Sequence, residues 1–207
     1  MAKWGNCNFE QLKQLRKRLE KLENMDLDSF CREASKELAA RLLALVIPRT
    51  PVGKKPKLTG EKSRKIKGVS GKSGSFLTAE AVRLEQYWGG YIGGTLRRGW
   101  TAKTHEEAAG GNGMPTAAQA KEYAKSLPVQ KAGHNYRVYV INPVKWAGYV
   151  EFGHRQTPGI YVPALGKSLK SAWVNGQYFL TISEEELNRI APAILQRRLD
   201  EFLREVF

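Results

Sequence analysis

Cysteine is scarce in this sequence, and long apolar runs are absent. The spacing of Cys7 and Cys31 fits neither a zinc site nor a disulfide framework, so we expect reduced thiols. No run approaches the ~20 apolar residues of a membrane span, and the longest covers only residues 42–47. Residues 1–7 lack the apolar core of a secretory signal. We therefore expect neither a secreted nor a membrane protein.

A nucleotide-binding loop is also missing. Gly71-Lys72-Ser73 matches the end of the phosphate-binding motif, but its first glycine would have to stand at position 66, which is isoleucine. Because the backbone amides between the two glycines must wrap the phosphates, this spacing argues against nucleotide hydrolysis.

The sequence contains no constellation of catalytic or metal-binding residues. His105, His134 and His154 are far apart, and no acid or cysteine lies at ligand spacing from them. Glu151 and Arg155 could form half of an acid–base pair, but no second carboxylate lies near them in the sequence, and a salt bridge is the simpler expectation. We predict a protein that is not an enzyme, with no catalytic residue, no metal and no cofactor.

What the sequence has is a sufficient apolar content and an excess of positive charge. Hydrophobic residues make up 42% of its 207 residues, enough for one domain with a real core, and the formal net charge is +14. Half of that charge lies between residues 53 and 74, where Glu61 opposes eight basic residues: Lys54, Lys55, Lys57, Lys62, Arg64, Lys65, Lys67 and Lys72. Two interpretations are open, contact with a polyanion such as nucleic acid phosphate, or a solvated loop.

Two helices are predicted at the N-terminal end. The first spans residues 8–24, with Asn8 as its N-cap and a leucine stripe at positions 12, 15, 19 and 22. The second begins at Asp28 and is ended by Pro48. Its predicted buried face consists of Phe30, Ala34, Leu38, Leu42 and Leu45.

The middle of the chain alternates between loops and short elements. Residues 48–75 are rich in proline, glycine, serine and lysine and are predicted to form a long loop. A strand is expected over 95–103, a loop over 106–113, and a short helix from Pro115 to Ser126 that covers an edge or projects from the domain. Alternation over residues 136–141 predicts the clearest strand.

The C-terminal part is predicted to be a long helix. Ser183 and Glu186 have the spacing of a capping box, and apolar residues recur at helical spacing from Leu187 to Val206. Pro192 falls inside this pattern, so we expect a kink.

The segment Trp146–Arg155 combines aromatic, acidic and basic residues in ten positions. As a strand, it would place Tyr149 and Glu151 on one face and Val150 and Phe152 on the other. A short helix leading into a turn at Gly153 is the alternative. Such a mixture suits a surface that meets another protein better than a catalytic cleft.

Three segments together resemble a family of tailed-phage proteins. Tyr149–Arg155 (Tyr-Val-Glu-Phe-Gly-His-Arg) is similar to the signature of the tail-completion, or head–tail joining (minor tail), proteins. Thr50-Pro51-Val52 and Gly94–Trp100 resemble two further motifs of that family, in the same order. The match covers roughly residues 10–52, 94–104 and 136–207. This chain departs from the family pattern by about forty residues inserted between the first two motifs.

The resemblance implies an α+β fold with N-terminal helices, a central antiparallel sheet of about four strands, and a kinked C-terminal helix packed on the sheet. The whole chain, residues 1–207, would form a single tail-completion-like domain. It would carry a basic loop insertion at about 53–93 and a smaller insertion at about 106–133. Gln177–Thr181 approximately matches a strand of the family.

The resemblance further implies a structural virion protein that is assembled in the host bacterial cytoplasm. It would form a homo-oligomeric ring, six copies by the family pattern, in the neck between the connector and the viral tail. Partners would be connector or neck proteins and tail-terminator or tail-tube proteins, with non-specific DNA contact in the lumen and no membrane. We expect the subunit or docking interface to include Tyr149, Glu151, Phe152, His154, Arg155, Arg97 and Arg98. The basic loop would line the DNA lumen or contact a partner ring.

Two alternatives remain open from the sequence. A tail terminator ring that caps the tail tube is also a small α+β ring subunit. A basic nucleic-acid-binding protein, a different class, is favoured by the net charge of +14.

Overall fold

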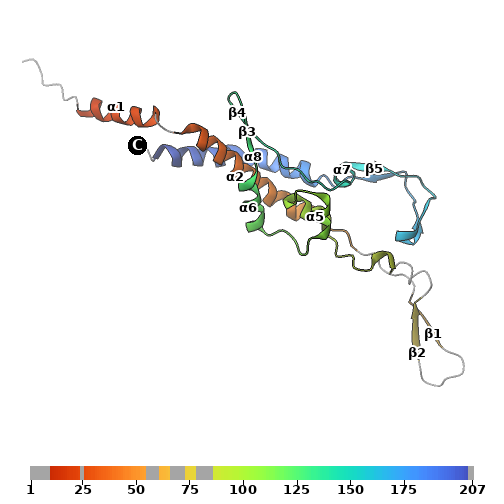
Figure 1. Ribbon diagram of the computed structural model, residues 1–207. Helices are drawn as coiled ribbons and strands as arrows, with labels where there is room; N and C mark the ends of the chain where they lie inside the picture. The colour runs from red at the N-terminus through yellow and green to blue at the C-terminus, as the bar shows by residue number, and fades with distance from the viewer. Residues whose placement is uncertain (1–9, 24–25, 55–60, 66–72, 78–85, 205–207) are drawn as a thin grey trace, which may run out of the picture.

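The computed structural model describes residues 10–23, 26–54, 61–65, 73–77 and 86–204. Figure 1 shows an elongated molecule in which α2 and α8 run side by side, α1 extends beyond one end, and the β1–β2 ribbon stands at the other. The helices are α1 (Glu10–Glu23), α2 (Leu27–Arg49), α4 (Thr95–Arg98), α5 (His105–Gly110), α6 (Ala117–Ser126), α7 (Ala147–Phe152) and α8 (Phe179–Arg204), with 3-10 turns η1 (Gly99–Thr101) and η2 (Pro163–Leu165). The strands are β1 (Glu61–Lys65), β2 (Ser73–Leu77), β3 (Val129–Ala132), β4 (Asn135–Val138), β5 (Gly153–Arg155), β6 (Tyr161–Val162), β7 (Lys167–Ser168) and β8 (Trp173–Asn175).

The α+β class is confirmed, but the strands do not form one central sheet. Those in the described residues pair as four two-stranded antiparallel ribbons, β1–β2, β3–β4, β5–β8 and β6–β7. Each strand has at most five residues, and such short strands bury too little apolar surface to build a layer of their own. The helices therefore form the core, and α8 packs on α2 rather than on a sheet.

Helix α2 is the centre of the core, because α6 and α8 both pack against it. Its buried residues include Ala39, Leu43, Val46 and Ile47, which pack with residues of α4, η1, α6 and α8. Of the predicted buried face, only Ala34 is buried, and the remaining four residues are half-buried. The predicted buried face of α2 was wrong because two helices, α6 and α8, pack against α2 instead of one.

The N-terminal end of α2 is close to its predicted position. The Asp26 carboxylate accepts from the Ser29 amide (3.0 Å) and so caps the first turn. Pro48 lies inside the last turn, and the helix ends one residue later, at Arg49. Helix α1 also matches its prediction, whereas its proposed N-cap, Asn8, lies outside the described residues.

Helix α6 belongs to the core. Its N-terminus has a full capping box between Thr116 and Gln119, and Ala120 and Ala124 are buried against α2. Alanine at these positions allows the two helices to approach closely. The expectation that this helix projects or only covers an edge was therefore wrong, and part of the loop expected at 106–113 forms α5.

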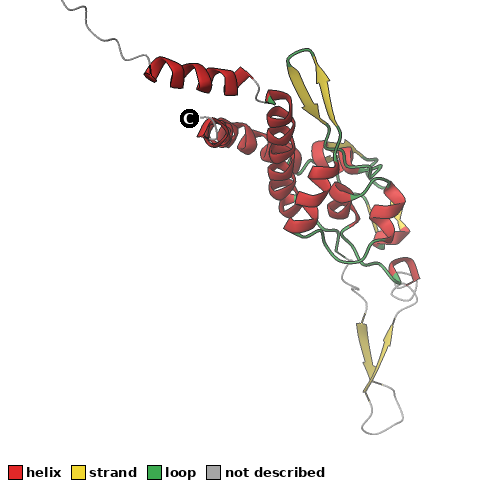
Figure 2. Ribbon diagram, turned by 60° about the vertical axis from the view of Figure 1, so that its left-hand side comes forward, coloured by secondary structure: helices red, strands yellow, loops and turns green. Residues whose placement is uncertain are grey.

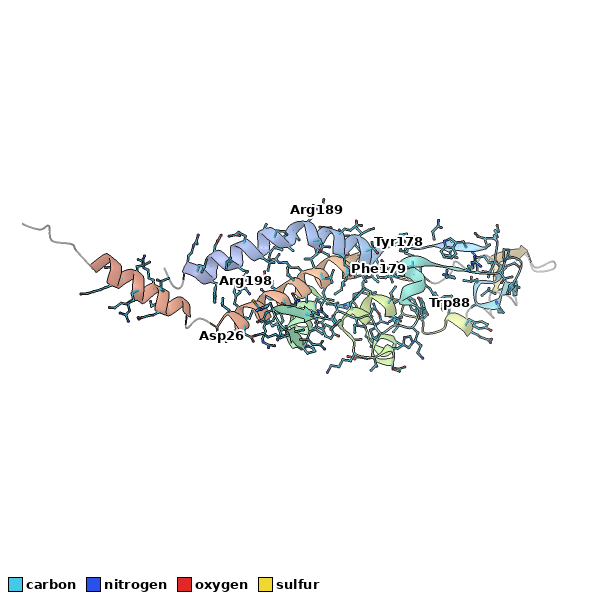
Figure 3. All side chains as sticks on the ribbon, turned by 90° about the horizontal axis from the view of Figure 1, so that it is seen from above. Asp26, Trp88, Tyr178, Phe179, Arg189 and Arg198 are labelled. Carbon is cyan, nitrogen blue, oxygen red and sulfur yellow. The ribbon has the colours of Figure 1, made fainter. Side chains whose placement is uncertain are left out.

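Two predicted strands are helical. Residues 95–101 form α4 and η1, and Gln177–Thr181 contains the start of α8. Helix α8 thus begins four residues before Ser183, and the predicted capping box does not exist. Ser183 is buried, and its hydroxyl donates to the Phe179 carbonyl (2.7 Å). The helix continues through Pro192 and bends near Arg189 in Figure 3, as expected for a proline that disrupts the preceding turn.

The β3–β4 hairpin is tied to the start of α2 by Asp28. Its carboxylate accepts from Lys131 Nζ (2.6 Å), Tyr136 Oη (2.7 Å) and Arg32 Nε (2.5 Å). Lys131 first, and then Arg32 and Tyr136, hold the pKa of Asp28 well below its ordinary value. The stabilisation from a lowered carboxyl pKa is present above the ordinary value of about 4 and is lost as the pH falls through the lowered value.

We predict that replacing Asp28 by asparagine loosens the hairpin without unfolding the domain. Amide hydrogen exchange in β3 and β4 should accelerate at pH 7, while exchange in the core of α2 stays slow. In the unaltered protein, lowering the pH from 7 to 5 should leave the hairpin protected, because Asp28 remains ionised over that range. Equal protection of the hairpin in both proteins would contradict this role of Asp28.

Candidate functional site

Two of the three sequence motifs meet at Thr50, directly after α2. Trp100 Nε1 donates to Thr50 Oγ1 (2.7 Å), and that hydroxyl donates to the Val46 carbonyl (2.7 Å). The Arg97 guanidinium donates to the Thr50 carbonyl through Nε (3.0 Å) and through a terminal nitrogen (2.6 Å). Thr50 and Trp100 are both buried. The motifs Thr50-Pro51-Val52 and Gly94–Trp100 are therefore two sides of one packed contact.

Arg98 also connects segments of this region, and its side chain does so from a buried position. Its side chain is buried and donates to the main-chain carbonyls of Ala108 (2.8 Å) and Gly93 (2.7 Å). Buried guanidinium groups require such partners because desolvation of a charge is costly. Arg97 and Arg98 thus hold segments of the same subunit together, and the predicted interface role is not available to the buried side chain of Arg98.

The third motif segment lies at the start of α8. Residues 147–152 form α7, the helical alternative for this segment, and Glu151 is only 3% exposed. Its carboxylate accepts from the Leu180 amide (3.0 Å), the Thr181 amide (2.9 Å) and the Thr181 hydroxyl (2.7 Å). The carboxylate satisfies amides of the first turn and opposes the positive end of the helix dipole. Glu151 therefore caps α8 in place of the predicted Ser183.

Close backbone contacts fix this cap. The amides of Gln177 and Tyr178 donate to the carbonyls of Val150 (2.8 Å) and Glu151 (3.1 Å). A Cβ at Gly176 would lie 2.2 Å from the Glu151 carbonyl oxygen, so only glycine fits there. Gly153, at φ +85°, starts β5 in a conformation that L residues rarely adopt.

The three motifs come together through Phe179. Its ring packs edge-on against the Trp100 indole at a centroid distance of 6.2 Å, and Figure 3 places Phe179 at the end of α8 beside α2. We call Thr50, Trp100, Glu151 and Phe179 the motif junction. Sequence reasoning identified the motifs but placed Phe179 and Thr181 in an expected strand and gave them no role at the site, because their partners are distant in the sequence.

Next to the motif junction, aromatic side chains are exposed. Tyr149 and Phe152 on α7 are each 61% exposed, Trp173 on β8 is 49% exposed, and Tyr178 is also exposed. These segments adjoin, because β8 pairs with β5 directly after α7 and Tyr178 bonds to the Glu151 carbonyl. We call Tyr149, Phe152, Trp173 and Tyr178 the aromatic surface. Clustered exposed aromatics are typical of protein–protein contact sites.

The remaining predicted interface residues lie at the edge of this surface. His154 is half-buried with its ring 5.7 Å from that of Tyr149, and Arg155 is exposed opposite Trp173 in the β5–β8 ribbon. The predicted grouping of Tyr149 with Glu151 on one face was wrong, because in a helix these residues point apart: Tyr149 faces outward and Glu151 inward.

The predicted basic loop is described only in part. Lys54 is exposed, and Lys62, Arg64 and Lys65 belong to β1, whose backbone pairs with β2 in an antiparallel ribbon. Lys55, Lys57, Lys67 and Lys72 lie outside the described residues. Figures 1 and 2 show the β1–β2 ribbon standing away from the helical body.

Among the described residues, no three histidine, cysteine, aspartate or glutamate side chains are grouped so that they could hold a metal ion. A search of the same part of the chain for a helix long and apolar enough to span a membrane finds none.

Comparison with known proteins shows similarity to a known protein family. The family model described as “Bacteriophage HK97-gp10, putative tail-component” matches residues 13–153, more than half of the chain. The matched range includes Thr50, Trp100 and Glu151 of the motif junction. Neither a curated protein nor a solved structure is significantly similar to the chain. The chain belongs to the HK97-gp10-like family of bacteriophage tail components.

Proposed function

We propose that this protein forms a ring at the junction between the head connector and the tail, where it completes the tail and joins it to the head. In this role it is a structural virion protein that works through protein–protein contacts. Its neighbours are copies of itself, the connector or neck proteins on one side, and the tail-terminator or tail-tube proteins on the other. In a closed ring of six copies, every subunit uses the same two surfaces to contact its two neighbours.

The aromatic surface carries this proposal. A tail component must bind other virion proteins, and Tyr149, Phe152, Trp173 and Tyr178 expose large apolar side chains beside a rigidly braced helix start. Aromatic side chains contribute a large share of binding energy at protein interfaces. The motif junction supports this surface from inside, which gives the family motifs a positioning role in assembly.

Electron microscopy of particles made without the protein tests the proposed position. Separate tails of normal length together with full, unjoined heads are the expected products. Complete virions would contradict the proposal. Overlong tail tubes would instead support the tail terminator, the alternative within the same class.

A substitution within the aromatic surface gives a finer test. Replacing Phe152 by aspartate should leave the fold intact, because the side chain is 61% exposed, but should weaken association by about 30-fold or more if it is an interface hot spot. Lys121→Asp on α6 introduces the same residue at another exposed site and should change little. Joined particles would be counted in lysates of phage complemented with each variant. Equal counts for the two variants would speak against the surface.

The basic segment favours a second contact. Residues 53–74 carry a net charge of +7, and part of them forms the projecting β1–β2 ribbon. We propose that this segment lines the DNA lumen or binds the neighbouring ring. Titration with duplex DNA at increasing salt distinguishes these, because phosphate contacts lose affinity steeply with salt. A protein whose main role is nucleic acid binding would show tight, salt-sensitive binding and would leave particle assembly unaffected when residues 54–73 are deleted.

A further inference from the structure

Helix α1 carries leucines at helical spacing, and two of them are exposed. The sequence has leucine at positions 12, 15, 19 and 22, the spacing of one face of a helix, and Leu15 and Leu19 are 48% and 54% exposed. Figures 1 and 2 both show α1 standing away from the helical body. A helix with a continuous leucine face requires a partner, since water is an unfavourable environment for that face.

An apolar groove is present elsewhere on the same chain. It lies between α2, α8 and the β3–β4 hairpin and has a volume of about 450 Å³. Phe30, Cys31 and Leu38 line it from α2, and Leu195 and Leu199 line it from α8. Both α8 leucines remain partly exposed, so the groove presents an uncovered apolar surface.

The groove and the stripe match in length and in chemistry. The part of α2 that lines the groove, from Phe30 to Leu38, is about 12 Å long along the helix axis. The part of α1 from Leu12 to Leu19 is about 10 Å long. Amphipathic helices commonly bind in such grooves, with the apolar residues at positions i, i+3 or i+4, and i+7 inserted into the groove. We infer that α1 of one copy binds in the α2–α8 groove of a neighbouring copy.

The direction of α1 favours a neighbouring copy as the occupant. At 1.5 Å per residue its 14 residues span about 21 Å, and in Figure 1 the helix extends away from the helical body whose α2 and α8 line the groove. Because every copy then offers a helix on one side and a groove on the other, the contact is head-to-tail, the type of contact from which closed rings are built when the rotation between copies closes. The inference rests on the proposed ring assembly and deepens it by naming a contact between successive copies.

Cys31 allows a direct test, because it lines the groove. The full-length chain would carry Cys7→Ser together with Leu19→Cys, and its matched control would carry Cys7→Ser with Lys17→Cys on the opposite face of α1. After mild oxidation, a non-reducing gel should show a ladder of linked multimers for Leu19→Cys. The linked fraction should be about tenfold larger than for the control, because the docked helix holds the two thiols at high effective concentration.

The other outcomes also decide the question. A fast-migrating monomer with an internal disulfide would mean that α1 folds back into its own groove, and it would overturn the inference. Equal linkage of both variants, or linkage of neither, would also overturn it.

A second pair of variants avoids cysteine chemistry. Leu15→Glu with Leu19→Glu should reduce self-association in sedimentation by about tenfold or more, whereas Lys17→Glu should not. Circular dichroism would confirm that both remain folded, and unchanged association of the first variant would overturn the inference.

These experiments use purified protein, so they are independent of the position in the particle. A ladder of multimers from a protein whose absence leaves heads and tails joined would refute the proposed function and keep the helix–groove contact. Unjoined heads and tails without specific linkage would do the reverse.

Discussion

Replacing Glu151 by alanine should destabilise the folded protein by about 3 kcal/mol. The substitution leaves the amides of Leu180 and Thr181 and the hydroxyl of Thr181 without their acceptor in a buried site. Hydrogen bonds to a charged acceptor are stronger than neutral ones, and the helix dipole adds to the loss. Urea denaturation followed by circular dichroism would measure the change.

Two further variants make this result specific. Glu151→Gln keeps one acceptor oxygen and the side-chain volume, so it should cost about half as much. Glu184→Ala removes an exposed glutamate of α8 and should change the unfolding free energy by less than about 0.5 kcal/mol. If Glu151→Ala and Glu184→Ala unfold at the same urea concentration, Glu151 is not the cap that organises α8.

Trp100→Ala should be the most destabilising single substitution at the motif junction, at about 4 kcal/mol. Its side chain is 2% exposed, packs on Phe179, and donates to Thr50, so alanine removes apolar contact and a buried hydrogen bond together. Trp100→Phe keeps most of the ring volume and should cost about 1–2 kcal/mol, because Thr50 Oγ1 retains its bond to the Val46 carbonyl.

Trp173 provides the matched control. It is 49% exposed on the aromatic surface, so Trp173→Ala should leave the unfolding free energy within about 0.5 kcal/mol of the unaltered protein. The same variant should impair particle assembly. A fully stable Trp100→Ala protein would contradict the motif junction, whereas a strongly destabilised Trp173→Ala protein would mean that Trp173 is a core residue.

The predictable part of this fold is the part that local patterns decide. The leucine spacing of α1 and the proline near the end of α2 gave these helices to within a few residues. The α6 helix was predicted from Pro115 as a helix start, and the strand predicted over 136–141 overlaps β4 at residues 136–138; both predictions rest on local signals. The family resemblance, which rests on the order of three short motifs, is confirmed by the family model.

The rest of the fold depends on contacts between residues that are distant in the sequence, which no local pattern indicates. Ser183 and Glu186 have capping-box spacing, yet α8 starts earlier because Glu151, about thirty residues away, caps it. Glu186 instead pairs with Arg49 of α2. Glu151 was expected at an interface because the resemblance implied that its segment forms the subunit or docking contact. Its burial follows from a helix end that only the tertiary structure places beside it.

The position of the protein in the particle is the central claim, and labelling tests it most directly. Virions carrying a tagged copy of the chain would be decorated with gold-conjugated antibody and imaged by electron microscopy. A single cluster of label at the boundary between head and tail is the expected result. Label distributed along the tail tube, or gathered at the tail tip, would contradict a ring at the head–tail junction.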